Sequence, residues 1–368
     1  MTSVSWGRRA RALLLACAVL ASIVSTRSAI TRIDAPETCI EPNKRVTMYA
    51  DELPRTPEGK ARVGYGLQRG KPTIPGPTIE LIEGDCLGIT LVNDVSRETL
   101  AEIRDDPILG NRDPNHPLGV SLHVHGVKYT TGSDGTLHSG SWVPPGEVRT
   151  YIWHAAPRAT VAQRVASLGT AGYWWYHDHV VGTSHGTGGS ASGLFGALVV
   201  RRPGDLEPDR QYVVGMGPNA TLNLRKDPDC ESHINPVPSN TCYVARQGER
   251  VEFIVIGFGD DFHTFHLHGH TWTDNRTGIP TSEADDTRLI DAKTIGPSET
   301  FGFQIIAGEE VGTGMWMLHC HVQTHSDNGM STFLHVLPAS VQLPSAPALP
   351  DVPGEAAAPL PSAEHVHR

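Results

Sequence analysis

The sequence contains few cysteines and few aromatic residues, and beyond its first 24 residues it has no long apolar run. It has six cysteines and six methionines, and Phe, Trp and Tyr make up 6% of its 368 residues. Because a membrane-spanning helix needs about 20 apolar residues, we predict no stable association with a membrane. Acidic residues (40) outnumber basic residues (30), which gives a net charge of −10. This excess of negative charge argues against nucleic acid as a partner.

The first 28 residues have the pattern of a signal peptide. They read MTSVSWGRRARALLLACAVLASIVSTRS, with three arginines before an apolar run from Ala12 to Val24 and small residues near Ser28. Such a segment directs export and is then removed. We therefore expect a secreted or periplasmic protein. Arg8 and Arg9 leave both the general and the twin-arginine export routes open.

Turn residues are abundant, and the apolar runs between them are short. The chain has 38 glycines and 28 prolines, and runs such as EFIVIGF and ALVV are rich in β-branched residues. This pattern predicts an all-β fold. The length is sufficient for two domains. Residues 339–368 have too little apolar bulk to form a core and are predicted to be a disordered tail.

Four of the six cysteines are candidates for disulfides. Cys17 lies in the predicted signal peptide, and Cys320 lies within a histidine-rich motif. In an exported protein the remaining four predict two disulfide bonds, for which three pairings exist. We favour Cys39 with Cys86 and Cys230 with Cys242, because the second pair closes a short loop rich in proline and asparagine.

Histidine pairs of the form His-x-His occur six times, whereas about one is expected by chance. His123 and His177 are 54 residues apart, and His266 and His319 are 53 residues apart. The flanks also match, because SLHVHG resembles TFHLHG and GYWWYHDH resembles GMWMLHCH. A repeated period with repeated motifs predicts two related domains, which we place at 29–204 and 205–338. Residues 95–119 form an insertion found only in the first.

The paired histidines have the spacing of metal ligands on a strand. Side chains alternate between the faces of a strand, so both histidines of a pair face the same way, about 6.6 Å apart. Zinc would need only three or four ligands and favours cysteine-rich sets. A larger number of neutral imidazoles suits copper. The eight candidate ligands are His123, His125, His177, His179, His266, His268, His319 and His321.

Cys320 should face away from its neighbours His319 and His321, toward a different metal. Two histidines, one cysteine and a weakly bound methionine form the ligand set of a blue-copper site. His263, His325 and Met330 complete that set. The first domain has Val120, Asp178 and Thr183 where the second has His263, Cys320 and His325, so we predict one such site per chain.

The motifs HVHG, HDH, HTFHLHG and HCHVQTHSDNGM resemble the four copper-binding motifs of the multicopper oxidases, and the length resembles that of small two-domain bacterial laccases. The resemblance implies two cupredoxin-like β-barrel domains and four coppers per active unit. It assigns His263, Cys320, His325 and Met330 to type 1 copper and His123 and His266 to type 2 copper. It assigns the type 3 pair to His125, His177, His179, His268, His319 and His321.

The resemblance also implies a reaction and an assembly. Phenols or aromatic amines would lose single electrons at type 1 copper, and dioxygen would be reduced to water at the trinuclear cluster. Cys320 would bind type 1 copper while its two neighbours bind the cluster. The expected assembly is a homotrimer in which the cluster lies between subunits. Met330 as axial ligand predicts a modest type 1 potential.

The rest of the predicted catalytic set concerns proton delivery and hydrogen bonding. Cys320 and His325 serve electron acceptance, and Asp134 and Asp274 are candidate proton donors. Tyr129 shares strand parity with His123 and is a candidate redox or hydrogen-bonding group. Solvated loop acids and ordinary core packing are the competing interpretations. The competing functions are a metal-ion (Fe, Mn or Cu) oxidase, a copper nitrite reductase and a non-catalytic copper carrier.

Overall fold

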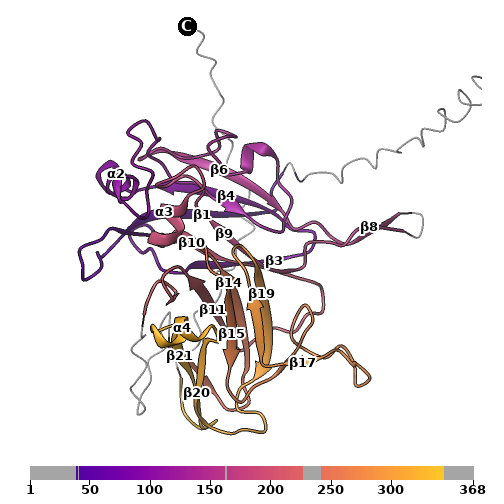
Figure 1. Cartoon of the computed structure of the whole chain (residues 1–368). Helices are drawn as coiled ribbons and strands as arrows, with labels where there is room; N and C mark the ends of the chain where they lie inside the picture. The colour runs from indigo at the N-terminus through magenta and orange to yellow at the C-terminus, as the bar shows by residue number, and fades with distance from the viewer. Residues whose placement is uncertain (1–38, 40, 162–163, 227–241, 344–368) are drawn as a thin grey trace, which may run out of the picture. The chain divides into compact units, whose positions relative to one another are not determined.

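Figure 1 shows the computed structural model of the chain. The chain divides into two units, residues 1–38 and residues 39–368. The structure describes residues 39, 41–161, 164–226 and 242–343, all within the second unit. The predicted signal peptide, Cys230 and residues 344–368 of the predicted tail lie outside the described residues. In the described part, no helix is long and apolar enough to cross a membrane.

The first half of the described chain forms two four-stranded sheets, as the all-β prediction requires. One has the strand order β2-β1-β4-β6, with β1 (Lys44–Leu53), β2 (Arg62–Gly66), β4 (Cys86–Asn93) and β6 (Val148–His154). The other has the order β3-β10-β9-β5, with β3 (Gly76–Ile82), β5 (His123–Val124), β9 (Gly172–His177) and β10 (Phe195–Arg201). A separate hairpin pairs β7 (Ala159–Val161) with β8 (Arg164–Ser167).

The second half repeats this arrangement. One sheet has the order β12-β11-β14-β19, with β11 (Arg210–Gly217), β12 (Thr221–Leu222), β14 (Arg250–Gly257) and β19 (Thr300–Ile306). The other has the order β13-β21-β20-β15-β18, with β13 (Tyr243–Arg246), β15 (His263–Leu267), β18 (Ala292–Ile295), β20 (Gly314–Cys320) and β21 (Ser331–Leu337). A short pair joins β16 (Trp272–Thr273) to β17 (Leu289–Ile290).

The duplication extends to hydrogen-bond register. β1 runs parallel to β4 in the first half, and β11 runs parallel to β14 in the second. His123 lies opposite His177 on the paired strands β5 and β9, and His266 lies opposite His319 on β15 and β20. The two sequence repeats are therefore structural repeats, and each brings its two His-x-His motifs onto adjacent strands.

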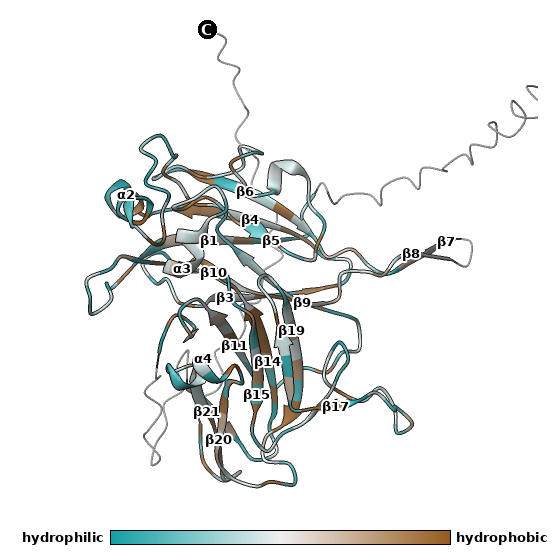
Figure 2. Cartoon of the chain, viewed as in Figure 1, coloured by the Kyte–Doolittle hydropathy of each residue, from teal (hydrophilic) through white to brown (hydrophobic). Residues whose placement is uncertain are grey.

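Apolar side chains fill the interior of each half and the contact between the halves. Figure 2 shows the apolar residues concentrated on strands such as β14. A separate cluster of buried apolar residues joins the halves. It contains Tyr173, Trp175 and Phe195 from the first half and Ile254 and Phe258 from the second. Burying such aromatic and aliphatic area contributes roughly 25 cal/mol per Å². This contact holds the two sandwiches together within one chain.

The insertion contains a helix that sequence analysis did not identify, α2 (Arg97–Asp105). Ser96 caps it, because its hydroxyl accepts a hydrogen bond from the Thr99 N–H at 3.2 Å. The other helical segments are α3 (Thr187–Ser192), α4 (Gln323–Asp327) and the 3-10 turn η1 (Thr131–Ser133).

The disulfide predicted between Cys39 and Cys86 is present. Cys242 is also disulfide-bonded, but its predicted partner Cys230 lies outside the described residues.

Candidate metal centres

The first candidate centre gathers a cysteine and two histidines in the second half. β15 supplies His263, β20 supplies Cys320 at its end, and α4 supplies His325. The Nδ1 atoms of the two histidines lie 3.2 Å apart. The Cys320 Sγ lies 3.9 Å from one and 3.8 Å from the other. Three donor atoms therefore converge on one point.

This centre lies on the core side of its strands. His263, Cys320 and Met330 are fully buried, whereas His325 is partly exposed. Met330 is held next to the cysteine, because the Cys320 N–H donates to the Met330 carbonyl at 3.0 Å. Burial lowers the pKa of His263 to about 4, so its imidazole is neutral and free to act as a ligand at neutral pH. Soft sulfur with neutral nitrogen is a donor set that fits copper.

The first-half histidine set lies on the ends of β5 and β9. The Nε2 atoms of His125 and His177 lie 3.2 Å apart. The His123 ring lies 5.1 Å from that of His179. Burial lowers the pKa of His125 to about 4 and holds that of His177 well below its usual value, and the neighbouring histidines lower both further. Four imidazoles therefore gather at one place.

The second-half set repeats this geometry. The Nε2 atoms of His268 and His319 lie 3.2 Å apart, the same separation as in the first half. The His266 and His321 rings lie 5.5 Å apart. His268 and His321 are solvent-exposed. Strand alternation explains why this set faces outward while Cys320, between His319 and His321, faces the core.

In both sets, backbone carbonyls orient the rings. Nδ1 donates to a main-chain oxygen and leaves Nε2 as the free donor atom, which is the usual second contact of a metal-binding histidine. These pairs are His123 with Asp134 at 2.7 Å, His177 with Asp178 at 2.7 Å, His266 with Asp291 at 2.8 Å and His319 with Cys320 at 2.8 Å. These four imidazoles are thus oriented for metal binding.

The two sets are separate groups within one chain. Ligand atoms of His123, His125 and His177 lie within 4.8 Å of one another, and so do those of His266, His268 and His319. Among the described residues, no ring contact joins a histidine of one set to a histidine of the other. Each set alone therefore supplies only part of an eight-histidine site.

The three candidate accessory residues have different surroundings. The Tyr129 ring lies 6.0 Å from the His123 ring. The Asp134 carboxylate lies 3.7 Å from the His123 Nδ1. Burial and the Asp134 carboxylate raise the pKa of Tyr129. Asp274 instead accepts hydrogen bonds from Lys293 at 2.7 Å and Arg288 at 2.8 Å, which hold its pKa below the usual value. Tyr129 and Asp134 are near a candidate ligand, whereas Asp274 belongs to an ion-pair cluster.

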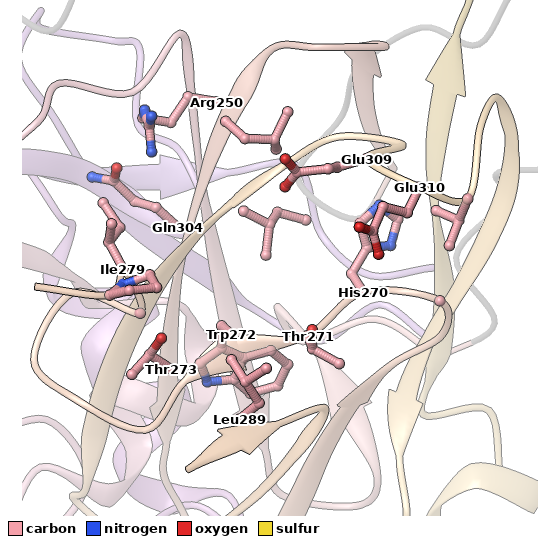
Figure 3. Close-up of a pocket in the computed structure, with 16 residues that line it drawn as sticks. Arg250, His270, Thr271, Trp272, Thr273, Ile279, Leu289, Gln304, Glu309 and Glu310 are labelled. Carbon is pink, nitrogen blue, oxygen red and sulfur yellow. The ribbon is translucent and has the colours of Figure 1, made fainter. Parts of the chain in front are cut away.

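A cavity of about 550 Å³ lies in the second half, and none of the candidate ligands lines it. Figure 3 shows its wall, with Arg250 on one side, Glu309 and Glu310 on another, and Trp272 and His270 among the lining side chains. His270 is fully bonded, since its Nδ1 donates to the His268 carbonyl and its Nε2 accepts from the Gly308 N–H. We therefore assign His270 a supporting role beside the second-half set.

Sequence reasoning missed the contacts that orient the site. The carbonyls of Asp134 and Asp291 are main-chain atoms, and their positions depend on loop conformation rather than residue type. The buried carboxylate of Asp178 was recognised only as a replacement for cysteine. The only sequence signal for the contact between Asp178 and Ser121 is the match between the two repeats, in which Ser121 corresponds to Thr264.

The folds of known proteins agree with this geometry. Residues 211–340 match the sequence profile of the family described as multicopper oxidase. A solved multicopper oxidase structure superimposes with a TM-score of 0.55 at 20% identity, over 79% of this chain and 88% of that one. The superposition shows a cupredoxin-like fold, as predicted, and the described residues carry clustered histidines and one buried free cysteine.

Two curated relatives extend the similarity beyond the matched segment. A probable nitrite reductase-hydroxylamine oxidoreductase fusion protein of Kuenenia stuttgartiensis is 32% identical over 73% of this chain. Mouse ceruloplasmin is 26% identical over 61% of this chain. The chain spans 28% and 22% of the lengths of these relatives. Residues 211–340 therefore form a domain of the multicopper oxidase family, and that family implies copper as the metal.

Proposed function

We propose that the protein is an exported laccase-type oxidase that takes single electrons from phenols or aromatic amines and reduces dioxygen to water. The observation that carries the proposal is the position of Cys320, buried at the first centre between two outward-facing histidines of the second-half set. Copper bound at such sites supplies one-electron acceptance from the donor and four-electron reduction of dioxygen. The chain places both kinds of site on one strand.

The residues of the first centre suit electron acceptance from an outside donor. Cys320, His263 and Met330 are shielded from water, which favours a stable, rigid ligand set. His325 is partly exposed on α4, so its ring offers a contact for a donor at the surface. We assign His263, Cys320, His325 and Met330 to one copper of type 1.

The eight histidines are proposed to hold three further coppers. We assign His123 and His266 to type 2 copper and the other six to the type 3 pair. Because the two sets are separate and partly solvent-facing within one chain, a complete cluster requires a second copy. The proposed assembly is a homotrimer with one cluster at each subunit boundary, since head-to-tail contacts form a ring when the rotation between subunits closes.

Tyr129 and Asp134 are proposed to handle protons at the first-half set. Asp134 lies beside His123 and also accepts a hydrogen bond from the Thr136 hydroxyl at 2.7 Å. A carboxylate within reach of the site and of polar neighbours can pass protons inward. Asp274 was the second candidate, but its two cationic partners favour its ionised form at neutral pH.

The direct test combines oxygen uptake with a donor panel. Purified copper-loaded protein is expected to consume one dioxygen per four electrons with phenols and aromatic amines and to release no peroxide. Cys320→Ser is expected to abolish donor oxidation, because hydroxyl oxygen is a poor substitute for thiolate sulfur at this site. Oxidation of Fe(II), Mn(II) or Cu(I) with no turnover of phenols would identify the metal-ion oxidase instead.

A second candidate is a copper nitrite reductase, favoured by the name of the relative from Kuenenia stuttgartiensis. The number of clustered histidines argues against it, because a site with one catalytic copper has no use for eight. Anaerobic assays with nitrite and a reduced donor separate the two functions. Nitrite consumption without oxygen uptake would replace the oxidase proposal.

A further inference from the structure

The first half carries a buried carboxylate at the position where the second half carries its cysteine. Asp178 lies between His177 and His179 and is 0% exposed. Resting on the proposed function, we infer that Asp178 is a positioning residue that fixes the first-half histidines in the geometry needed for the trinuclear cluster. The inference stands on its hydrogen bonds and on comparison with the second half.

Both carboxylate oxygens accept hydrogen bonds from different chain segments. Oδ1 accepts from the Ser121 N–H at 2.8 Å, and Oδ2 accepts from the Val180 and Val181 N–H groups at 2.9 and 2.6 Å. Ser121 lies two residues before His123, while Val180 and Val181 follow His179. One side chain therefore joins the segment carrying His123 to the segment carrying His179.

Hydrogen bonds also connect Asp178 to its two sequence neighbours, His177 and His179. The Asp178 carbonyl accepts the Nδ1–H of His177 at 2.7 Å. The Ser121 hydroxyl accepts the His179 N–H at 2.9 Å and donates to the Asp178 Oδ1 at 3.4 Å. His177 and His179 are thus linked to Asp178 by one or two hydrogen bonds. His123 lies two residues from Ser121, which is itself a hydrogen-bond partner of Asp178.

The second half makes equivalent backbone contacts with sulfur in place of the carboxylate. Cys320 Sγ accepts from the Thr264 N–H at 3.5 Å, as Asp178 Oδ1 accepts from Ser121. Cys320 N–H donates to Met330, and Asp178 N–H donates to Leu194, both at 3.0 Å. In the second half a bound metal would organise this region. In the first half, which lacks those ligands, the carboxylate organises it.

Packing prevents the carboxylate from moving away. Gly189 of α3 lies against it, and a Cβ there would be 2.3 Å from the Asp178 Oδ2. The absence of a side chain at this position leaves room for the carboxyl group. A polar residue held this tightly transmits its geometry to the neighbouring strands.

The main variant is Asp178→Asn, which keeps the shape. An amide accepts hydrogen bonds on one side only, so either the Ser121 or the Val180 and Val181 N–H groups would face an NH₂ group. Loss of contacts that orient metal-binding histidines typically weakens metal binding about 10- to 100-fold. We expect this loss for the cluster coppers alone, measured as copper per chain during titration with a chelator.

Two further variants separate positioning from general stability. Asp205→Asn removes a carboxylate that pairs with Arg276, away from the histidines, and is expected to lower the melting temperature without changing copper content. Ser121→Ala removes only the hydroxyl and is expected to weaken cluster copper less than Asp178→Asn does. Ser121→Ala tests the inference if Asp178→Asn does not fold.

The outcomes are read from paramagnetic resonance and the blue absorption of the mononuclear site. Loss of the type 2 signal with retention of the blue band supports the inference. Unchanged cluster copper in both Asp178→Asn and Ser121→Ala overturns it, as does parallel loss of blue and cluster copper. Wild-type protein that binds no cluster copper would overturn the proposed function itself, which distinguishes the two failures.

Discussion

Met330 and Leu194 occupy equivalent backbone positions in the two halves. Each accepts a hydrogen bond from the residue at the cysteine position, Cys320 or Asp178, at 3.0 Å, and each is fully buried. One half therefore offers a thioether to the buried pocket where the other offers only a hydrocarbon. This difference in donor atoms, at positions with the same backbone hydrogen bond, is our reason for proposing a blue-copper site in the second half only.

Exchanging this methionine tests its role as an axial ligand. Met330→Leu is expected to raise the type 1 potential, because a weak thioether ligand stabilises the oxidised copper and leucine does not. The swap conserves volume, so the free energy of unfolding should change by less than about 1.5 kcal/mol. Redox titration of the blue absorption measures the effect. An unchanged or lowered potential would mean that Met330 is not a ligand.

The candidate ligands were predictable from sequence because their signal is local. Strand alternation places His319 and Cys320 on opposite faces of β20, and the buried cysteine and outward histidine follow from it. The Ser121 to Asp178 contact and the carbonyl partners of the rings were not predictable. They join atoms far apart in sequence, and nothing in residue type alone specifies them.

At the scale of elements, the first His-x-His motif of each half is followed by a glycine covered by a tryptophan. Gly126 has φ +80° and Gly269 has φ +71°, a backbone region that favours glycine. A Cβ would lie 2.0 Å from the Trp174 ring in the first half and 2.6 Å from the Trp316 ring in the second. Glycine is therefore required at this turn for two reasons: its backbone has a positive φ, and the tryptophan leaves no room for a Cβ.

Alanine at these turns separates the two requirements. Gly126→Ala combines backbone strain of about 1–2 kcal/mol with overpacking of about 1–3 kcal/mol. Gly140→Ala is the matched control, because Gly140 has φ +64° but no atom near its Cβ. Urea unfolding should show a larger loss for Gly126→Ala. Equal losses would mean that the tryptophan contact contributes nothing.

At the scale of the whole described unit, a buried charge network joins the two halves. Glu252 is 0% exposed and accepts from Arg201 at 2.9 and 2.8 Å and from the Tyr173 hydroxyl at 2.7 Å. Arg201 and Tyr173 belong to the first half and Glu252 to the second. Sequence could not reveal this network, because its partners are more than 50 residues apart.

Removing one partner leaves the other charge buried. Glu252→Gln is expected to cost about 3–5 kcal/mol of unfolding free energy at pH 7. Burial alone would raise the pKa of Glu252, but hydrogen bonds from Arg201, Gln304 and Gln211 outweigh it and hold the pKa below its ordinary value of 4.5.

The stability from this depressed pKa is present above pH 4.5 and is lost as pH falls through the lower folded value. Chemical denaturation at a series of pH values should therefore show wild type losing stability below pH 4.5 more steeply than Glu252→Gln. Parallel curves would show that Glu252 is not ionised in the folded protein.

The assembly prediction follows from the separation of the two histidine sets. His123→Ala disables every first-half set, and His266→Ala disables every second-half set, so a homotrimer of either variant should have no complete cluster. If a cluster forms between the first half of one chain and the second half of the next, mixed trimers regain some complete sites. Random assembly from equal amounts restores about a quarter of them, since each half is intact in half of the chains.

The measurement is oxygen uptake by co-expressed or co-refolded variants, with size determined by light scattering. Activity near a quarter of wild type is expected, and the same variants mixed after folding should stay inactive if the ring does not exchange. The chain with an intact second half also retains Cys320 and His325, so each restored cluster adjoins a working electron-accepting site. A complete absence of complementation in verified mixed oligomers would mean that both histidine sets of a cluster come from one chain.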